Sequence, residues 1–237
     1  MALKSGNAAY SLLANKLNSL FSKKNVAMMG GYGYPTIREY FSVGVEDGDD
    51  PATTYFAQTT GNAESDIDLT SAAGTLTLFV NDGSNDNLKS VGKYVFSVKA
   101  NVTSINCESE IAFSNLAAIG CFGFIAHDFG NVDDDTGETA ANQLACVFHD
   151  GDTVNFNTSN GTSLQQTDIT VYVAEGTSYK FHIKVTPTAA QLYIDDILRA
   201  THSTYIPGEC LAVLLYAANN GENATINTQY IEAWTEL

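Results

Sequence analysis

Apolar and polar residues alternate strictly in the segment 179–185. A period of two predicts a β-strand with one buried side and one side facing water. Two shorter apolar runs follow at 191–194 and 197–200, separated by Asp195 and Asp196. Acidic residues tolerate the positive φ angles of a tight turn. The pattern therefore predicts a strand followed by a β-hairpin.

The rest of the chain after Lys24 shows almost no helical periodicity. Short apolar runs alternate with clusters of Gly, Asn, Asp, Ser and Thr. The last apolar run is 211–218, and 228–234 is predicted to be the final strand. This spacing is typical of many antiparallel strands joined by turns. A chain of 237 residues is long enough for one large β-sandwich with an appendage. We expect an all-β protein.

The order of elements in 178–237 resembles the C-terminal half of concanavalin A-like lectin and glucanase domains, including laminin-G-like and phage-borne versions. In that family a strand of the type Y-x-F-x-I-x-V precedes a hairpin, and the domain closes on a strand that ends near a tryptophan, here Trp234. The resemblance covers 92–237 well and 36–91 weakly, and Asp196 stands where the hairpin usually has glycine. It implies an antiparallel two-sheet jelly-roll sandwich. It does not imply one function, because the family includes lectins, glycoside hydrolases and structural modules.

The N-terminal segment differs from the remainder in charge and in periodicity. The chain has a net charge of −16, yet residues 1–24 contain four lysines and no acidic residue. Apolar side chains at helical spacing predict a short amphipathic helix. They are Tyr10, Leu13, Leu17, Leu20 and Phe21. A Gly/Tyr-rich stretch at 28–35 follows, in which Tyr32 and Tyr34 suit an interface.

Two interpretations of this segment remain open. The helix could pack against its own sandwich, as most apolar helix stripes do, or it could dock on another chain. We adopt the second, so that residues 1–35 form a docking helix and arm and 36–237 form the lectin-like sandwich. Lys16 and Asn18 interrupt the apolar region, which argues against a signal peptide, and the segment is too short to span a membrane. The acidic charge argues against a nucleic-acid partner.

The cysteines predict neither a disulfide scaffold nor a zinc site. Cys107, Cys121, Cys146 and Cys210 lie within or beside apolar segments, and their spacing matches no compact metal motif. Free cysteine packs as a small hydrophobic residue. We favour buried free thiols over two disulfides.

The loop 127–138 concentrates oxygen ligands that suit a hard cation. Asp133, Asp135 and Glu138 are the candidate calcium ligands, and no other cofactor is expected. Thr136 occupies the position where an EF-hand needs glycine, so that specific motif fails. An exposed acidic loop is the alternative interpretation.

No catalytic set emerges from the sequence. Glu64, Asp66 and Asp68 superficially resemble the alternating carboxylates of glucanases with this fold, but their polar surroundings would leave all three ionised, with no general acid. The four histidines form no recognisable triad with a nucleophile. Tyr230 and Trp234 lie on one face of the last strand and are candidates for stacking a sugar ring.

These observations lead us to predict a non-enzymatic virion protein. It would be a phage capsid decoration or head-fibre subunit, held by its N-terminal arm to other virion proteins such as a major capsid protein. We expect a homo-oligomer at the virion surface, made in the host cytoplasm. A carbohydrate-binding lectin or tail-fibre adhesin, which would contact a surface glycan, is the alternative. A glycoside hydrolase is the third, and it would require paired carboxylates.

Overall fold

The computed structural model is all-β over the part of the chain that it describes. It describes residues 36–40, 56–60, 66–70, 75–80, 87–97, 102–126, 141–151, 153–208, 210–218 and 221–236. Apart from Thr36, these residues belong to one compact unit, Ile37–Leu237. The predicted helix and arm of residues 1–35 lie outside the described residues.

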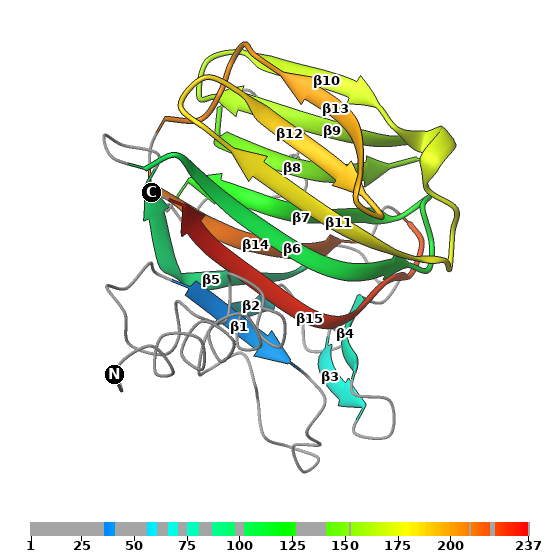
Figure 1. Cartoon of the computed structure of the whole chain (residues 1–237). Helices are drawn as coiled ribbons and strands as arrows, with labels where there is room; N and C mark the ends of the chain where they lie inside the picture. The colour runs from blue at the N-terminus through cyan, green and yellow to red at the C-terminus, as the bar shows by residue number, and fades with distance from the viewer. Residues whose placement is uncertain are drawn as a thin grey trace, which may run out of the picture. The chain divides into compact units, whose positions relative to one another are not determined.

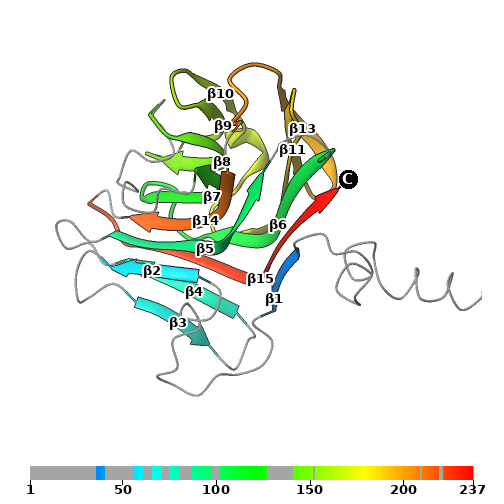
Figure 2. The same ribbon diagram turned by 90° about the vertical axis from the view of Figure 1, so that its left-hand side faces the viewer.

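The described strands form two sheets, shown face-on in Figure 1 and from the side in Figure 2. Sheet A contains, in spatial order, β13 (Ile197–His202), β12 (Ala190–Ile194), β11 (Ser178–Val185), β6 (Ser104–Phe113), β15 (Ala224–Glu236), β4 (Thr75–Val80) and β3 (Asp66–Thr70), and β1 (Thr36–Tyr40) pairs with β15. Sheet B contains β10 (Leu164–Asp168), β9 (Thr153–Asn160), β8 (Gln143–Asp150), β7 (Ile119–Ala126), β14 (Cys210–Ala218), β5 (Asn87–Ser97) and β2 (Phe56–Thr60). A short 3-10 turn, η3 (Thr170–Tyr172), follows β10.

The antiparallel two-sheet jelly-roll sandwich predicted from the sequence is confirmed. Strand β11 matches the alternating segment, and β12 and β13 form the hairpin. The turn residues Asp195 and Asp196 have φ angles of 52° and 64°. An aspartate takes this conformation more readily than most residues, because its short side chain can bond nearby backbone. Here Asp195 Oδ1 accepts a 3.0 Å hydrogen bond from the Lys180 amide and so ties the turn to β11.

The two sheets differ in how apolar their outer faces are. The main core lies between them and includes Ile111 and Phe181 from sheet A and Phe122 and Leu215 from sheet B. A second buried cluster lies on the opposite face of sheet B and includes Leu144, Cys146, Phe148, Leu214 and Tyr216. Sheet B is therefore apolar on both faces, which explains why β7 and β14 appear in the sequence as continuous apolar runs. The alternating strands of sheet A leave a polar outer face.

Three cysteines are buried free thiols, as predicted: Cys107, Cys121 and Cys146. Burial raises the pKa of the Cys107 and Cys121 thiols, so they stay protonated and chemically unreactive. Cys210 belongs to β14, but its side chain lies outside the description.

Candidate functional site

The strongest cluster of polar and aromatic side chains lies on the outer face of sheet A. Strand pairing brings the wet sides of four strands together, because β12, β11, β6 and β15 are consecutive neighbours. His182 of β11 stands opposite Tyr193 of β12 on one side and opposite Glu108 of β6 on the other. Glu232 of β15 stands opposite Glu108 in turn. Residues far apart in the sequence thus form one continuous surface.

Three rings form an aromatic row across this surface: Trp234, His182 and Tyr193. The His182 ring is stacked on Tyr193 with a centroid distance of 5.3 Å and an interplanar angle of 21°. On its other side it is stacked on Trp234 at 5.3 Å and 26°. Since β6 lies between β11 and β15, the contact between His182 and Trp234 bridges over that strand. Each ring restricts its neighbour, so the aromatic row is held in one arrangement.

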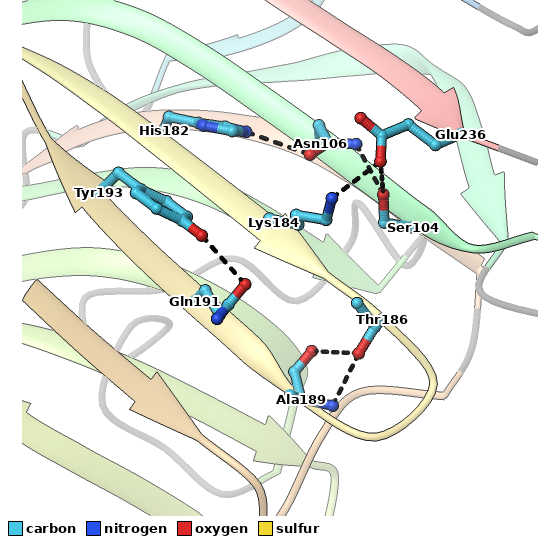
Figure 3. Close-up of polar contacts among 9 residues, drawn as sticks. All are labelled: Ser104, Asn106, His182, Lys184, Thr186, Ala189, Gln191, Tyr193 and Glu236. Carbon is cyan, nitrogen blue, oxygen red and sulfur yellow. Dashed lines mark hydrogen bonds and ion pairs between the residues drawn. The ribbon is translucent and has the colours of Figure 1, made fainter. Parts of the chain in front are cut away.

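A polar relay of hydrogen bonds runs from the aromatic row to the end of β15 (Figure 3). His182 Nε2 lies 3.1 Å from Asn106 Oδ1, Asn106 Nδ2 donates to Ser104 Oγ at 3.0 Å, and Ser104 Oγ donates to Glu236 Oε2 at 2.8 Å. An amide oxygen can only accept, so this arrangement assigns the proton to His182 Nε2. Lys184 Nζ also donates to Glu236 Oε2 at 2.8 Å. Every group in the relay is oriented by the next.

The charge of Glu236 is stabilised by this relay. Partial burial raises the pKa of the Glu236 carboxyl, but the hydrogen bonds from Lys184 and Ser104 outweigh it, and the pKa is lowered overall. Glu236 is therefore ionised at neutral pH and keeps Lys184 in place. On the neighbouring strand β12, Tyr193 Oη donates to Gln191 Oε1 of the same strand at 3.2 Å (Figure 3).

A pair of carboxylates lies beside the aromatic row. Glu108 and Glu232 stand directly opposite each other on β6 and β15, and Glu232 is only 4% exposed. Tyr230 Oη donates to Glu108 Oε1 at 3.1 Å. Burial and the nearby Glu108 charge raise the pKa of Tyr230, so its phenol remains a hydrogen-bond donor. The face thus joins aromatic rings, an amide and two facing acids.

Two further histidines, His149 and His202, are buried in the interior and stabilise the fold. His202 is fully buried and bonded through both ring nitrogens, to Thr158 Oγ1 at 2.7 Å and Thr167 Oγ1 at 2.9 Å. His149 is 1% exposed and donates from Nδ1 to the Leu116 carbonyl at 3.2 Å. Burial lowers the pKa of each ring to about 4. Neither lies on the outer face of sheet A.

The structure places only part of the predicted site residues. Tyr230 and Trp234 both lie on the outer face of sheet A, but Trp234 is 9% exposed and its ring is stacked on His182 instead of standing as an open platform. Asp66 and Asp68 belong to β3, at the edge of sheet A and away from the aromatic row, while Glu64 is outside the described residues. The remaining candidates also fall outside them: Tyr10, Leu13, Leu17, Leu20, Phe21, Tyr32, Tyr34, Asp133, Asp135 and Glu138.

Sequence reasoning missed the partners of these aromatics. The alternation in 179–185 did place His182 and Lys184 on a polar face, but no local signal identified Asn106, Glu108 or Tyr193 as their neighbours.

Among the residues that the structure describes, no group of three or more His, Cys, Asp or Glu side chains is arranged to hold a metal ion. Within that same part, no helix is long and apolar enough to cross a membrane.

Comparisons with known proteins identify the fold through structure alone. No family model matches the chain, and no curated protein matches its sequence. A β-1,3-1,4-glucanase (lichenase) derived from a mouse hindgut metagenome is 14% identical, with a TM-score of 0.58 over 85% of this chain and 99% of its own. The β-glucanase of Bacillus licheniformis is 14% identical, with a TM-score of 0.54 over 87% of this chain and 100% of its own. A pseudo β-1,3-glucanase of Mycobacterium tuberculosis is 9% identical, with a TM-score of 0.56 over 85% and 98%.

These comparisons confirm the concanavalin A-like sandwich and correct the predicted function. The matching structures are named as glucanases and glycoside hydrolases, which contradicts the prediction of a virion decoration or head-fibre protein. The prediction that the chain is not an enzyme is contradicted by the same matches, although one of them is described as a pseudo-glucanase. The error arose because the virion assignment depended on an acidic composition, an N-terminal apolar stripe and a resemblance to phage-borne members of the fold, and none of these is specific to viral proteins.

Proposed function

We propose that the protein recognises a glycan chain on the outer face of sheet A. The observation that carries this proposal is the aromatic row, held in one arrangement by stacking and by the polar relay. Sugars present both apolar C–H surfaces and hydroxyl groups, so their binding sites combine aromatic rings with fixed polar groups. The names of the glucanases that share this fold make a β-glucan the first ligand to test.

The polar groups around the aromatic row suit sugar hydroxyls. Gln191 carries an amide, which both donates and accepts, while Glu236 accepts and Lys184 donates. Asn106 is fully buried, so its amide orients His182 instead of reaching a ligand. These side chains are already ordered by one another, as Figure 3 shows. Binding a ligand here costs the protein less side-chain entropy than binding on a flexible surface would, because these side chains are already restricted.

Replacing Tyr193 should weaken glycan binding. We expect the Tyr193→Ala variant to bind soluble β-1,3-1,4-glucan about tenfold more weakly than the unmodified protein, which corresponds to roughly 1.4 kcal/mol. Tyr193→Phe keeps the ring and loses only the hydroxyl that bonds Gln191, so it should retain most of the affinity. Isothermal titration calorimetry measures both.

The matched control is Tyr172→Ala. Tyr172 is 38% exposed on η3, where its ring contacts Arg199 and not the aromatic row. Equal loss of affinity in this control and in Tyr193→Ala would contradict the proposed location. No binding of β-glucans or of other neutral glycans by the unmodified protein would contradict the function itself.

A second function, glycoside hydrolysis, is favoured by the facing pair Glu108 and Glu232. Directly opposite residues on antiparallel strands have Cβ atoms about 4.5–5.5 Å apart. Retaining glycosidases place their nucleophile and their acid–base carboxyl group roughly 5–5.5 Å apart. The strand pairing therefore brings two carboxyl groups close together, as a retaining mechanism requires, next to the surface that we propose binds the glycan.

The hydrolysis proposal predicts a loss of activity on removal of either acid. Glu108→Gln and Glu232→Gln should each abolish the release of reducing sugar from β-glucan, because the mechanism needs both a nucleophile and an acid. Asp68→Asn, on the edge strand β3, should leave the rate unchanged and serves as the control. An unmodified protein that binds glucan but releases no reducing sugar would exclude this second function and leave the first intact.

A further inference from the structure

Among the side chains that the structure describes, the outer face of sheet A carries more acid than base next to the aromatic row. Glu108 and Glu110 lie on β6, and Glu232 faces Glu108 from β15. In the register of β11 against β6, Glu108 stands opposite His182, the central ring of the aromatic row, and Glu110 stands opposite Lys180. The negative charge is thus next to the rings that we propose contact a glycan.

Lys180 and Lys184, the lysines of this face within the described residues, are both paired. Lys184 Nζ lies 2.8 Å from Glu236 Oε2, and Lys180 forms an ion pair with Asp196 of the hairpin turn. Partial burial lowers the pKa of Lys180, but Asp196 and Glu108 outweigh this and raise it overall, so the pairing persists at neutral pH. Each ammonium group is neutralised by its own partner, and an anionic ligand would have to compete with that partner.

We infer that this face selects glycans by charge, binding a chain with protonated amines more tightly than the uncharged chain, and the uncharged chain more tightly than a carboxylated or sulfated one. The inference rests on the proposed glycan-binding function. An ammonium group is attracted by the carboxylates beside the aromatic row. A carboxylate or sulfate would lose water in order to meet like charges, which is unfavourable.

Three derivatives of one soluble β-glucan backbone test the inference: hydroxyethyl (uncharged), carboxymethyl (anionic) and diethylaminoethyl (cationic). At low ionic strength we expect the dissociation constant to rise about fivefold from the cationic to the uncharged derivative, and about fivefold again from the uncharged to the anionic one. Each of these two differences is modest, because a single interaction between partly exposed charges is weak. At 1 M salt the two differences should nearly vanish, since the Debye length falls to about 3 Å.

Matched variants separate the local effect from the net charge of the chain. Glu108→Gln removes one charge beside the aromatic row and keeps an oxygen that can accept a hydrogen bond from Tyr230. It should therefore reduce both differences in dissociation constant between the derivatives. Glu222→Gln removes one charge from an exposed residue that precedes β15 and should leave them unchanged. Equal narrowing in both variants would assign the effect to the overall charge of −16 and overturn the inference.

The outcomes also separate this inference from the function on which it depends. Equal affinity for all three derivatives at low salt would overturn charge selection and leave glycan binding intact. Failure to bind the hydroxyethyl derivative, together with every other neutral glucan, would contradict the proposed function.

Discussion

The Gly123→Ala variant is expected to be destabilised by roughly 3 kcal/mol or more, a cost at the upper end of overpacking substitutions. Gly123 lies on β7 opposite Cys146 of β8. A Cβ atom added there would lie 2.4 Å from the Ala145 carbonyl oxygen and 2.6 Å from Cys146 Cα. Both are backbone atoms and cannot rotate away. Gly123 also has a φ of +153°, which residues with a side chain rarely adopt.

Urea unfolding of the variant and the unmodified protein measures this cost. Gly208→Ala is the control, because nothing lies within 4 Å of a Cβ atom built there. We expect Gly208→Ala to unfold at nearly the same urea concentration as the unmodified protein. A Gly123→Ala protein of unchanged stability would show that β7 and β8 do not approach each other as closely as described.

The two buried histidines are expected to make the protein less stable in acid. The folded-state pKa of His149 and of His202 is about 4, below the usual 6.5. Between these values the unfolded chain binds protons that the folded chain does not, so the free energy of unfolding falls as the pH is lowered from about 6.5 to about 4. Above 6.5 the contribution is fully present, and below 4 it is lost.

Each histidine should contribute roughly 3 kcal/mol to this change, because one pKa unit corresponds to about 1.36 kcal/mol. The size follows from burial: His202 is fully buried between two threonine hydroxyls, and His149 packs edge-on against Phe113 with a centroid distance of 4.6 Å. A charged ring in either place would lose its hydration without gaining an anionic partner among the hydrogen bonds described.

Unfolding measured at intervals from pH 7.5 to pH 4 tests the prediction by comparison with a variant. The acidic side chains also titrate in this range, so the informative quantity is the difference between the unmodified protein and the double variant His149→Gln with His202→Gln. The double variant will be less stable at pH 7.5, but its stability should depend less on pH. Parallel curves for the two proteins would contradict the assignment to these histidines.

The predicted hairpin and alternating strand are correct because both depend on local chemistry. The strand β11 needs only alternation, and the turn needs only two residues that tolerate positive φ, which Asp195 and Asp196 provide. The burial of Cys107, Cys121 and Cys146 was also predictable, because each lies within an apolar or alternating strand.

The candidate site was predicted only in part. Tyr230 and Trp234 were expected on one face, and they do lie on one, but the prediction treated Trp234 as an open platform. Its ring is instead stacked on His182, a residue 52 positions earlier in the sequence. No periodicity within a strand can indicate which ring a second strand will place against it.

Function was the least predictable property. A net charge of −16 and a basic N-terminal segment describe solubility and an interface in general terms, and they do not distinguish a virion protein from a carbohydrate-active one. The similarity to glucanases is detectable in the backbone at 9–14% identity, where the fold persists although most side chains differ.

The sequence by itself determined the all-β class, the β11 strand, the β12–β13 hairpin and the polar side of each alternating strand, since these depend on residues close together in the chain. Only the tertiary structure decided that β6 lies between β11 and β15, with Glu108 facing both His182 and Glu232. The physical reason is that strand order and register are set by the packing of the two sheets against each other, so they depend on contacts between segments that are distant in the sequence. That packing decides which residues become neighbours across a sheet, and the sequence of a single strand contains no periodic pattern that reveals them.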